Sequence, residues 1–271
     1  VSTLSGKQVG SVSRIGKRLV WHLEDDLHVV IHPMVAGRFH LRKPDAAVPR
    51  KNTLAVFDLP ADDTRPAARL LLTEASTKKR ATMSLVRGQE ALEAFRAGGL
   101  DVMTATDAEF SAALRRENHT IKRSLTDPRL FDGIGNAYSD EILHRARMSP
   151  MKLTRRLTDP EIARLAAATR ETLSLWIHRH RQKAGDKFPE KVTAFHDDMA
   201  VHGKFGKPCP DCGTPVQRIV YAENECNYCA VCQNDGRLLA DRALSRLLRA
   251  DWPRTLEDLE ALRRGAGTGP K

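Results

Sequence analysis

The first third of the chain alternates hydrophobic and polar residues in the way that is typical of β-strands. Within residues 17–41, apolar positions recur at every second residue over 19–23 and again over 27–31. The acidic triplet Glu24-Asp25-Asp26 separates the two runs, so the pattern predicts a β-hairpin. Two further strand-like runs, at 54–59 and 70–73, flank a turn rich in Pro and Asp around 60–66.

The apolar period becomes helical near residue 106. Thr106 and Glu109 have the spacing of a capping box, and apolar residues follow them at helical intervals. A second box, formed by Thr158 and Glu161, predicts the start of a longer helix. The apolar positions of that helix that can face a core are Ile162, Leu165, Leu173 and Trp176. We therefore expect the middle third to be helical.

Two breakers interrupt this helical third. Asp127-Pro128 and Gly133-Ile134-Gly135 predict short helices joined by tight turns. The glycines would free backbone amides at the start of the next helix, and such amides bind phosphate. A plain turn that joins two helices is the alternative; a dinucleotide-binding loop is excluded because the third glycine and the preceding strand are missing. Near the C-terminus we expect a helical run at 238–248 and an unstructured tail at 265–271.

Positive charge narrows the class of partner. The 271 residues contain 44 Lys and Arg against 34 Asp and Glu, a formal net charge of +10 with a pI near 9.6. This balance favours a polyanionic partner, of which nucleic acid is the first candidate. No run of eighteen apolar residues is present, and the first residues do not have the pattern of a signal or transit peptide. We therefore expect a cytoplasmic protein that has no membrane partner.

The cysteines have the spacing of a metal site. Cys209 and Cys212 form one Cys-x-x-Cys pair, Cys229 and Cys232 form a second, and sixteen residues separate the pairs. This is the zinc-ribbon spacing, so we predict one structural Zn²⁺ held by four thiolates, with no open position for catalysis. Unligated thiols are the alternative. The fifth cysteine, Cys226, is expected to be a small, partly buried residue.

These elements together resemble the formamidopyrimidine-DNA glycosylase and endonuclease VIII family. The segment 121–143 resembles the family's helix-two-turn-helix, and the cysteine pairs follow it at the distance of the family's zinc finger. Three shorter matches are Arg14-Ile15-Gly16-Lys17-Arg18-Leu19 to the lysine-bearing strand, His32-Pro33-Met34-Val35-Ala36-Gly37-Arg38 to the His-Leu-Gly-Met-Ser-Gly turn, and Val201-His202-Gly203-Lys204 to the approach to the finger. The resemblance covers residues from about 4 to 233.

The resemblance implies an α+β fold in four parts. Residues 1–98 would form a β-sandwich-like domain that lacks its opening helix and strands, and 104–200 a helix-two-turn-helix DNA-binding domain. Residues 201–236 would form the zinc-ribbon hairpin, and 237–271 a C-terminal helix with a disordered tail. The implied partner is damaged double-stranded DNA, bound by a monomer.

The same resemblance implies roles for single residues, each with a simpler alternative. Lys17 would contact a phosphate beside the lesion, or it is a solvated lysine at a strand end. Asn136 would donate to another phosphate, or it is a turn asparagine. Glu141 would be the acid on the helix that orders the site, or a surface glutamate. Met34 would be the apolar wedge that fills the space left by an extruded nucleotide, or a gap-filler of the core.

Two departures from the family pattern concern DNA contact. Asn224 stands five residues before the third cysteine, where the family usually has an arginine. Asn224 retains hydrogen-bond donors but lacks the charged fork, so we expect a weaker hold on phosphate there, with Arg218 or Arg237 as possible substitutes. The family's void-filling loop is replaced by residues 73–80, whose basic run 78–80 either contacts phosphate or is a solvated turn.

The third departure concerns catalysis. The family's reaction uses an N-terminal proline as a secondary-amine nucleophile, followed by a glutamate, and this chain contains neither at its start, Val1. The resemblance therefore assigns no catalytic residue within the chain beyond the supporting Glu141. A start site placed too late, a fragment and a binding-only relative are the three explanations, and we favour the first. The expected function is a base-excision DNA glycosylase with AP lyase activity; the alternative is a catalytically inactive, zinc-dependent nucleic-acid-binding protein.

Overall fold

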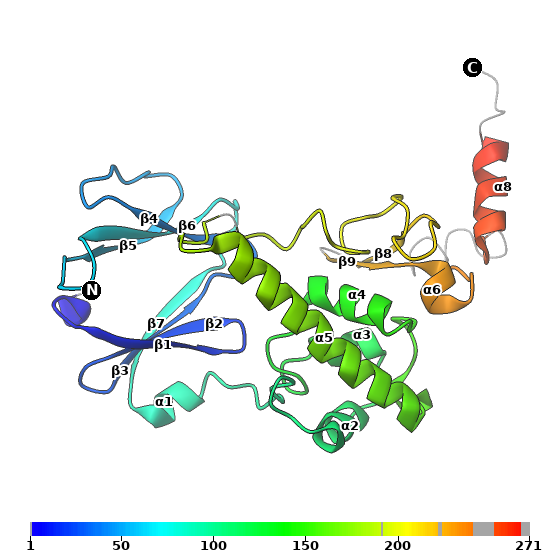
Figure 1. The fold of residues 1–271 in the computed structure, drawn as a ribbon, viewed down its shortest axis with the longest axis horizontal. Helices are drawn as coiled ribbons and strands as arrows, with labels where there is room; N and C mark the ends of the chain where they lie inside the picture. The colour runs from blue at the N-terminus through cyan, green and yellow to red at the C-terminus, as the bar shows by residue number, and fades with distance from the viewer. Residues whose placement is uncertain (1, 191, 222–223, 241–251, 267–271) are drawn as a thin grey trace. The chain divides into compact units, whose positions relative to one another are not determined.

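The computed structural model describes residues 2–190, 192–221, 224–240 and 252–266. It divides into two compact units (Figure 1). Unit 1 comprises Val1–Ala97 with Arg179–Thr193, and unit 2 comprises Gly98–His178 with Ala194–Lys271. The 26-residue helix α5 (Asp159–Ala184) therefore contributes its first part to unit 2 and its last turns to unit 1.

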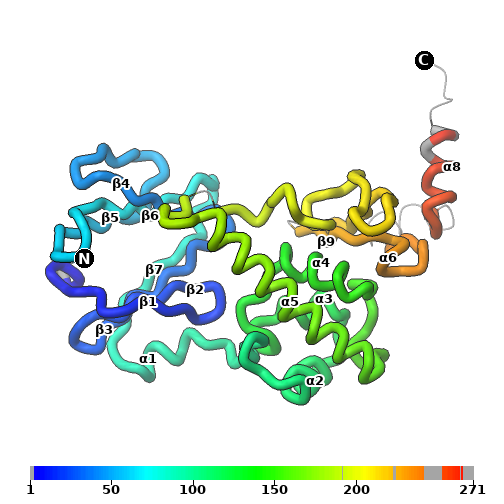
Figure 2. The backbone as a smooth tube through the Cα atoms, in the orientation of Figure 1, coloured from blue at the N-terminus to red at the C-terminus, as the bar shows by residue number. Residues whose placement is uncertain are grey.

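Unit 1 is built from two antiparallel sheets. The four-stranded sheet has the order β1-β2-β3-β7, with β1 (Val9–Ile15), β2 (Arg18–Leu23), β3 (Leu27–His32) and β7 (Thr82–Arg87). The three-stranded sheet has the order β4-β6-β5, with β4 (Gly37–Arg42), β5 (Thr53–Leu59) and β6 (Ala68–Glu74). Two short helices accompany them, η1 (Ser2–Leu4) and α1 (Gln89–Glu93). The tube in Figure 2 follows the chain through these strands.

The predicted hairpin is confirmed by the pairing of β2 with β3. Leu19 lies opposite Ile31, and Trp21 lies opposite Val29. The acidic turn makes this pairing possible because Asp25 adopts the left-handed backbone conformation, with φ of 58°, as does its neighbour. The predicted strand runs at 54–59 and 70–73 are likewise found as the paired strands β5 and β6.

The alternation of β3 gives the sheet two different faces. Val29 and Ile31 pack with Leu72 of β6 and with aromatic residues of both sheets, so this face forms the core between the sheets. On the opposite face, Val30 packs with Val20 and with Leu92 of α1. Val29, Val30 and Ile31 thus pack on alternate faces of the sheet, with the two-residue period that the sequence predicted.

Unit 2 contains the helices. They are α2 (Asp107–Arg115), α3 (Ile121–Thr126), α4 (Asn136–Arg145), η2 (Thr154–Arg156) and α5. The capping box at α2 is confirmed: the Thr106 side chain accepts from the Glu109 backbone N–H, and the Glu109 carboxylate accepts from the Thr106 N–H. At α5, the Thr158 backbone N–H donates to Glu161 at 3.0 Å. Buried side chains from all four α-helices form one core, among them Phe110, Leu125, Ile142 and Leu165.

The breakers between α3 and α4 act where the sequence placed them. Helix α3 ends at Thr126, directly before Asp127-Pro128, and α4 begins at Asn136, directly after the glycines. Gly133 has φ of 82°, a conformation that suits glycine. Gly135 is the N-cap of α4 and offers no side chain, so the first backbone amides of this helix have no side-chain cap.

Unit 2 is completed by a C-terminal helix and by a β-hairpin that lies between the two cysteine pairs in the sequence and that we call the metal hairpin. The hairpin comprises β8 (Gln217–Tyr221) and β9 (Asn224–Tyr228), followed by α6 (Ala230–Asn234) and, later, α8 (Leu256–Ala266). The sequence did not predict α8, which includes the first residues of the expected unstructured tail. Of the predicted helical run at 238–248, residues 238–240 are not helical and the remainder lies outside the described residues. Within the described part of the chain, no helix combines the length and apolar character needed to cross a bilayer.

Candidate metal centre and nucleic-acid interface

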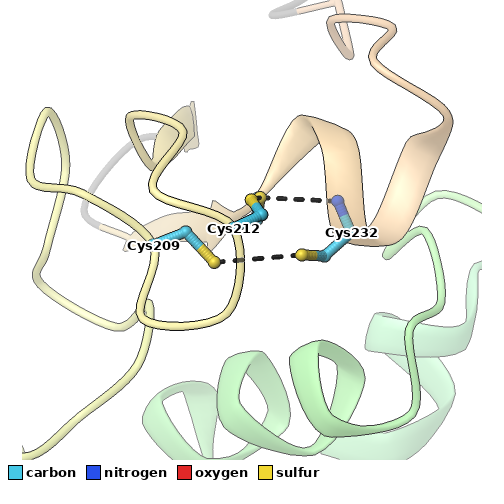
Figure 3. A group of neighbouring side chains, drawn as sticks. Cys209, Cys212 and Cys232 are labelled. Atoms are coloured by element: carbon cyan, nitrogen blue, oxygen red, sulfur yellow. Dashed lines mark hydrogen bonds between the residues drawn. The ribbon is translucent and has the colours of Figure 1, made fainter.

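Four cysteine side chains of unit 2 converge as the spacing predicted. Their Sγ atoms all lie within 4.8 Å of one another, with 3.9 Å between Cys209 and Cys232 and 3.4 Å between Cys212 and Cys229. Figure 3 shows the loop that bears Cys209 and Cys212 facing the short helix α6, which bears Cys232. A tetrahedral ion with metal–sulfur distances of about 2.3 Å requires sulfur–sulfur separations of roughly 3.8 Å. The cluster therefore fits one four-coordinate metal ion.

The start of α6 places the second cysteine pair. Cys229 is the N-cap of α6, and its Sγ accepts from the Cys232 backbone N–H at 3.4 Å. Burial alone would raise the pKa of Cys212, but hydrogen bonds from Thr214 and neighbouring cysteines lower it to about 7. Burial raises the pKa of Cys229 to about 11 and also raises the pKa of Cys232. Only the thiolate is a metal ligand, so a bound cation would have to favour ionisation of these two thiols.

Cys226 stands apart from this cluster. It lies on β9, is almost completely buried and packs with Ile219 and Tyr228 on the other face of the hairpin. Burial raises the pKa of the Cys226 thiol strongly. The residue is therefore a small apolar element of the hairpin core, more deeply buried than the sequence suggested.

A histidine and a carboxylate lie beside the four sulfurs. The Nε2 atom of His144, on α4, lies 3.2 Å from Cys209 Sγ, and donor atoms of His144, Asp211 and Cys232 lie within 4.8 Å of one another. Asp211 also meets Arg147 at 3.3 Å. Burial lowers the pKa of His144, which favours the neutral imidazole. Sequence reasoning missed His144, because 65 residues separate it from its cysteine.

The start of α4 is joined to the metal hairpin. The Asn136 side chain donates from Nδ2 to the backbone oxygen of Glu225, on β9, at 2.9 Å. Glu225 directly follows Asn224, which is exposed at the beginning of the same strand. The structure thus brings together two residues that the resemblance assigned to phosphate contact, one from the helix and one from the hairpin. Figures 1 and 2 both draw β9 beside α4.

Glu141 is not a surface glutamate. Its side chain is buried, and its carboxylate accepts three backbone N–H groups, from Ala200 at 2.8 Å and from Val201 and His202 at 2.9 Å each. A carboxylate that accepts several backbone amides fixes the path of the segment that supplies them. Glu141 therefore fastens the approach to the cysteine loop onto α4.

Asp140, the residue before Glu141, is a second buried hub that the sequence did not reveal. Its carboxylate is fully buried and accepts from Lys122 at 2.5 Å, from the Nδ1 atom of His202 at 2.8 Å and from the backbone N–H of Asn227 at 3.1 Å. Because an ionised carboxylate only accepts hydrogen bonds, His202 donates here. Asp140 thus ties α3, α4, the 200–203 segment and β9 together.

The predicted residues of unit 1 lie in exposed turns. Lys17 is exposed in the turn between β1 and β2. Met34 and Val35 lie in the turn between β3 and β4 and are 43% and 78% exposed, so Met34 is not a core residue. Met34 adopts a left-handed backbone, with φ of 54°. Gly37 closes the turn by donating to the Pro33 oxygen at 2.8 Å, and a Cβ at Gly37 would lie 2.2 Å from that oxygen.

The loop at 73–80 is organised around one buried acid. The Glu74 carboxylate accepts the backbone N–H groups of Arg80 and Ala81 and the hydroxyl of Ser76. The hydrogen bond from the Arg80 backbone, more than any other contact, lowers the pKa of Glu74, although burial opposes the shift. The basic run of the loop is therefore presented by a closed, internally bonded turn.

The two arginines considered as substitutes at the finger have partners within unit 2. The Arg218 guanidinium lies over the Phe205 ring at 4.3 Å from its centre, and also lies 3.6 Å from the Glu225 carboxylate. Arg237 pairs through its backbone with Thr255, which precedes α8. Arg218 is thus held on the hairpin beside Glu225, the residue after Asn224, whereas Arg237 pairs with the residue that precedes α8.

Comparison with known proteins decides the family. Residues 1–78 match the model of the formamidopyrimidine-DNA glycosylase N-terminal domain, and residues 101–186 match the model of its H2TH domain. The formamidopyrimidine-DNA glycosylase of Thermus thermophilus is 33% identical over 241 residues, which cover 85% of this chain and 84% of that protein. The protein of that name from Desulforamulus reducens is 34% identical over 233 residues, covering 82% and 79%. This chain belongs to the formamidopyrimidine-DNA glycosylase family.

Solved structures of the family agree with the fold of this chain. The formamidopyrimidine-DNA glycosylase of Lactococcus lactis in complex with DNA containing an abasic site has a TM-score of 0.74 at 26% identity, over 86% of this chain and 84% of its own. The same Lactococcus enzyme in complex with DNA containing an oxidised pyrimidine has a TM-score of 0.72 over the same shares. The resemblance drawn from the helix-two-turn-helix and cysteine motifs is thereby confirmed.

Proposed function

We propose that this protein is a base-excision-repair glycosylase that binds damaged duplex DNA, releases the damaged base and cleaves the strand at the resulting abasic site. The observation that supports this most directly is the hydrogen bond between Asn136 and Glu225. It fixes the uncapped start of α4 against the metal hairpin, so helix amides and hairpin donors are presented together. Such a pair of donor groups suits one bent stretch of sugar-phosphate backbone.

We propose that the four cysteines hold a zinc ion. Four thiolates at tetrahedral separation are the ligand set that zinc favours in structural sites, and no position is left open for substrate. The ion would keep the loop of Cys209 and the helix of Cys232 in register. Its contribution to function is then mechanical, because it shapes the hairpin that presents Asn224.

Three residues serve as phosphate donors in this proposal. Asn136 uses one of the two N–H groups of its amide for Glu225 and offers the other to phosphate. Asn224 donates from the exposed end of β9, next to Glu225, whose carboxylate lies 3.6 Å from the Arg218 guanidinium. Lys17 supplies a point charge from the turn between β1 and β2. Glu141 takes no part in contact with DNA; it holds the segment 200–202 in place for the others.

The apolar wedge is assigned to the tip of the turn at 33–37. Aligned without gaps, the family motif His-Leu-Gly-Met-Ser-Gly places its glycine at Met34 and its methionine at Val35. The left-handed backbone of Met34 agrees with a glycine position, and Val35 is the more exposed of the two side chains. We therefore propose that Val35 enters the base stack first, with Met34 beside it, which revises the expectation for Met34 alone.

The proline nucleophile of the family's chemistry and the glutamate that follows it are not among residues 1–271. In the family's chemistry, the nitrogen of an N-terminal proline bonds to sugar C1′ as the bond to the base breaks, and a neighbouring carboxyl group handles the protons. The iminium that forms on the opened sugar permits elimination of the adjacent phosphate, which nicks the strand. The residues of this chain would bind the DNA, extrude the nucleotide and position C1′ for that amine.

Borohydride trapping tests the proposal. The protein is prepared as residues 1–271 and, from the coding DNA, with an in-frame Met-Pro-Glu upstream of Val1. Reduction in the presence of abasic duplex DNA should give a covalent adduct with the longer protein only, while both should bind the duplex with an affinity that falls steeply with salt. Failure of the longer protein to form an adduct would overturn the lyase assignment. Efficient trapping of residues 1–271 would overturn the proline assignment.

The oligomeric state is proposed to be monomeric, and light scattering of the protein with and without DNA measures it. A dimer at micromolar concentration would contradict this proposal.

A further inference from the structure

Three polar residues form a stripe along α4 that faces the metal hairpin. Asn136, Asp140 and His144 recur at intervals of four residues, which places them on one side of the helix. Asn136 binds Glu225 near the start of β9, and Asp140 accepts from the backbone N–H of Asn227 near its end. His144, the last of the three, reaches Cys209.

The burial of His144 excludes water from this last contact. The side chain is 4% exposed, and Cys209 is also buried, so water does not compete for the 3.2 Å contact between Nε2 and Sγ. A cysteine bound to a metal is a thiolate and has no proton to donate. The hydrogen between the two atoms must then come from the imidazole, with Nε2–H as donor and the sulfur as acceptor.

The geometry also distinguishes an outer-sphere donor from a metal ligand. The four sulfurs lie within 4.8 Å of one another and supply the four donors of a structural zinc site, which leaves no position for a fifth. The group formed by His144 and Asp211 shares only Cys232 with that tetrahedron. Asp211 is substantially exposed and is paired with Arg147, as expected of a surface carboxylate beside the site.

We propose that His144 is a positioning residue of the metal centre, which donates its Nε2 hydrogen to the Cys209 thiolate and so anchors the cysteine cluster to the last turns of α4. The inference rests on the proposed zinc site and extends it to a group that the cysteine motif does not contain. A hydrogen bond from a buried donor stabilises the Cys209 thiolate against protonation and holds its rotamer, and both effects slow metal loss.

Zinc release measures this contribution. The wild-type protein, His144→Phe and His144→Gln are purified with their metal, and transfer of zinc to a chromogenic chelator is followed after zinc content has been determined. His144→Phe keeps an apolar ring but removes the donor, so release should be about 10- to 100-fold faster. His144→Gln retains an N–H at similar reach and should restore much of the lost retention. Asp211→Asn is the matched control and should release zinc at the wild-type rate.

Replacement of zinc by Co²⁺ distinguishes a hydrogen-bond donor outside the coordination sphere from a direct metal ligand. The ligand-field bands of Co²⁺ report the donor atoms. They should keep the position expected for four sulfurs in both wild type and His144→Phe. A shift of these bands in His144→Phe would show that His144 is itself a ligand and would overturn the proposal, as would equal zinc release from wild type and His144→Phe.

Two further measurements separate the possible failures. A wild-type protein without zinc refutes the zinc assignment itself, whereas one zinc per chain combined with unchanged release in the variants refutes only the role of His144. If His144→Phe does not fold, as judged by circular dichroism, His144→Met and His144→Gln provide the same comparison. These two side chains are similar in length and differ in the N–H donor, so equal release from them would also contradict the proposal.

Discussion

The start of α4 and the turn at 33–37 differ in how strongly their surroundings fix them. Around α4, Asp140 and Glu141 are buried, and each accepts three hydrogen bonds from other parts of unit 2. The turn at 33–37 projects Met34 and Val35 into solvent and is closed chiefly by its own backbone. One region is held by buried charge and the other by local backbone geometry.

This difference separates two tasks of a protein that binds a bent duplex. Donors that must match the fixed spacing of phosphates benefit from a preorganised support, because disorder there would be paid for on binding. An apolar side chain that enters a base stack needs exposure and a narrow tip instead. Substitutions of the buried acids Asp140 and Glu141 should therefore act chiefly through stability and metal retention, and substitutions at the turn chiefly through DNA binding.

Of the changes that test this difference between the two regions, removal of the metal should have the largest effect. Structural zinc sites contribute apparent free energies on the order of 10–16 kcal/mol, and the hairpin that presents Asn224 is too short to be stable without the cluster. We expect a strong chelator to lower affinity for abasic duplex DNA by more than about tenfold, equivalent to roughly 1.4 kcal/mol. Fluorescence anisotropy before and after readdition of Zn²⁺ checks this. Unchanged affinity in metal-free protein would contradict the mechanical role of the site.

The next largest effect is expected for Glu141→Ala. The change leaves three buried backbone N–H groups without their acceptor, and each such loss costs about 1–3 kcal/mol. We expect the free energy of unfolding to fall by about 3 kcal/mol or more, as measured by urea denaturation. Glu171→Ala is the control: Glu171 is exposed on α5, meets Arg145 at 3.4 Å, and should change stability by less than about 0.5 kcal/mol.

Glu74 provides a pH-dependent test in unit 1. Its pKa in the folded protein is lowered from 4.5, so its contribution to stability is complete above the pKa of the unfolded chain and is lost as pH falls through the folded value. Stability of unit 1 should therefore decline below about pH 4.5. Glu74→Gln should decline less steeply over the same range, because the substituted group does not titrate. Urea denaturation between pH 7 and pH 3 measures both proteins, and parallel curves would refute the assignment.

The smallest change in stability is expected at the exposed turn. Met34→Gly removes the cost of a left-handed backbone, about 1–2 kcal/mol, but adds the entropy of glycine, about 0.5–1 kcal/mol. Thermal unfolding should show a net gain of no more than about 1.5 kcal/mol. Val35→Ser, in contrast, should leave stability unchanged and weaken binding to lesion-containing duplex. A large loss of stability from Val35→Ser would show that the turn is part of the core.

The sequence predicted the elements whose signals are local. The two-residue period identified β2 and β3, the Thr106 capping box identified α2, and the paired cysteines identified the metal cluster. Strand β1 was missed because all but its first and last residues are exposed, which leaves little alternation to detect. The same limit applies to β7, in which every residue is exposed or half-buried.

The hydrogen bonds that hold the site together could not be predicted from local sequence patterns. Asp140 and His202 are 62 positions apart, and Asp140 and Asn227 are 87 apart, so nothing in their neighbouring residues indicates that they meet. Glu74 looks like part of a polar surface loop, yet it is the buried acceptor around which that loop closes. Polar residues that satisfy one another across long separations are revealed only by the folded chain.

The four-residue spacing of Asn136, Asp140 and His144 makes their three contacts depend on the register of α4. A single residue inserted between Asn136 and Asp140 would rotate the rest of α4 by about 100° around the helix axis. Asp140 and His144 would then lose their partners together, while Asn136 kept its own. Length changes within α4 should thus be far less tolerated during evolution or engineering than exchanges of single side chains.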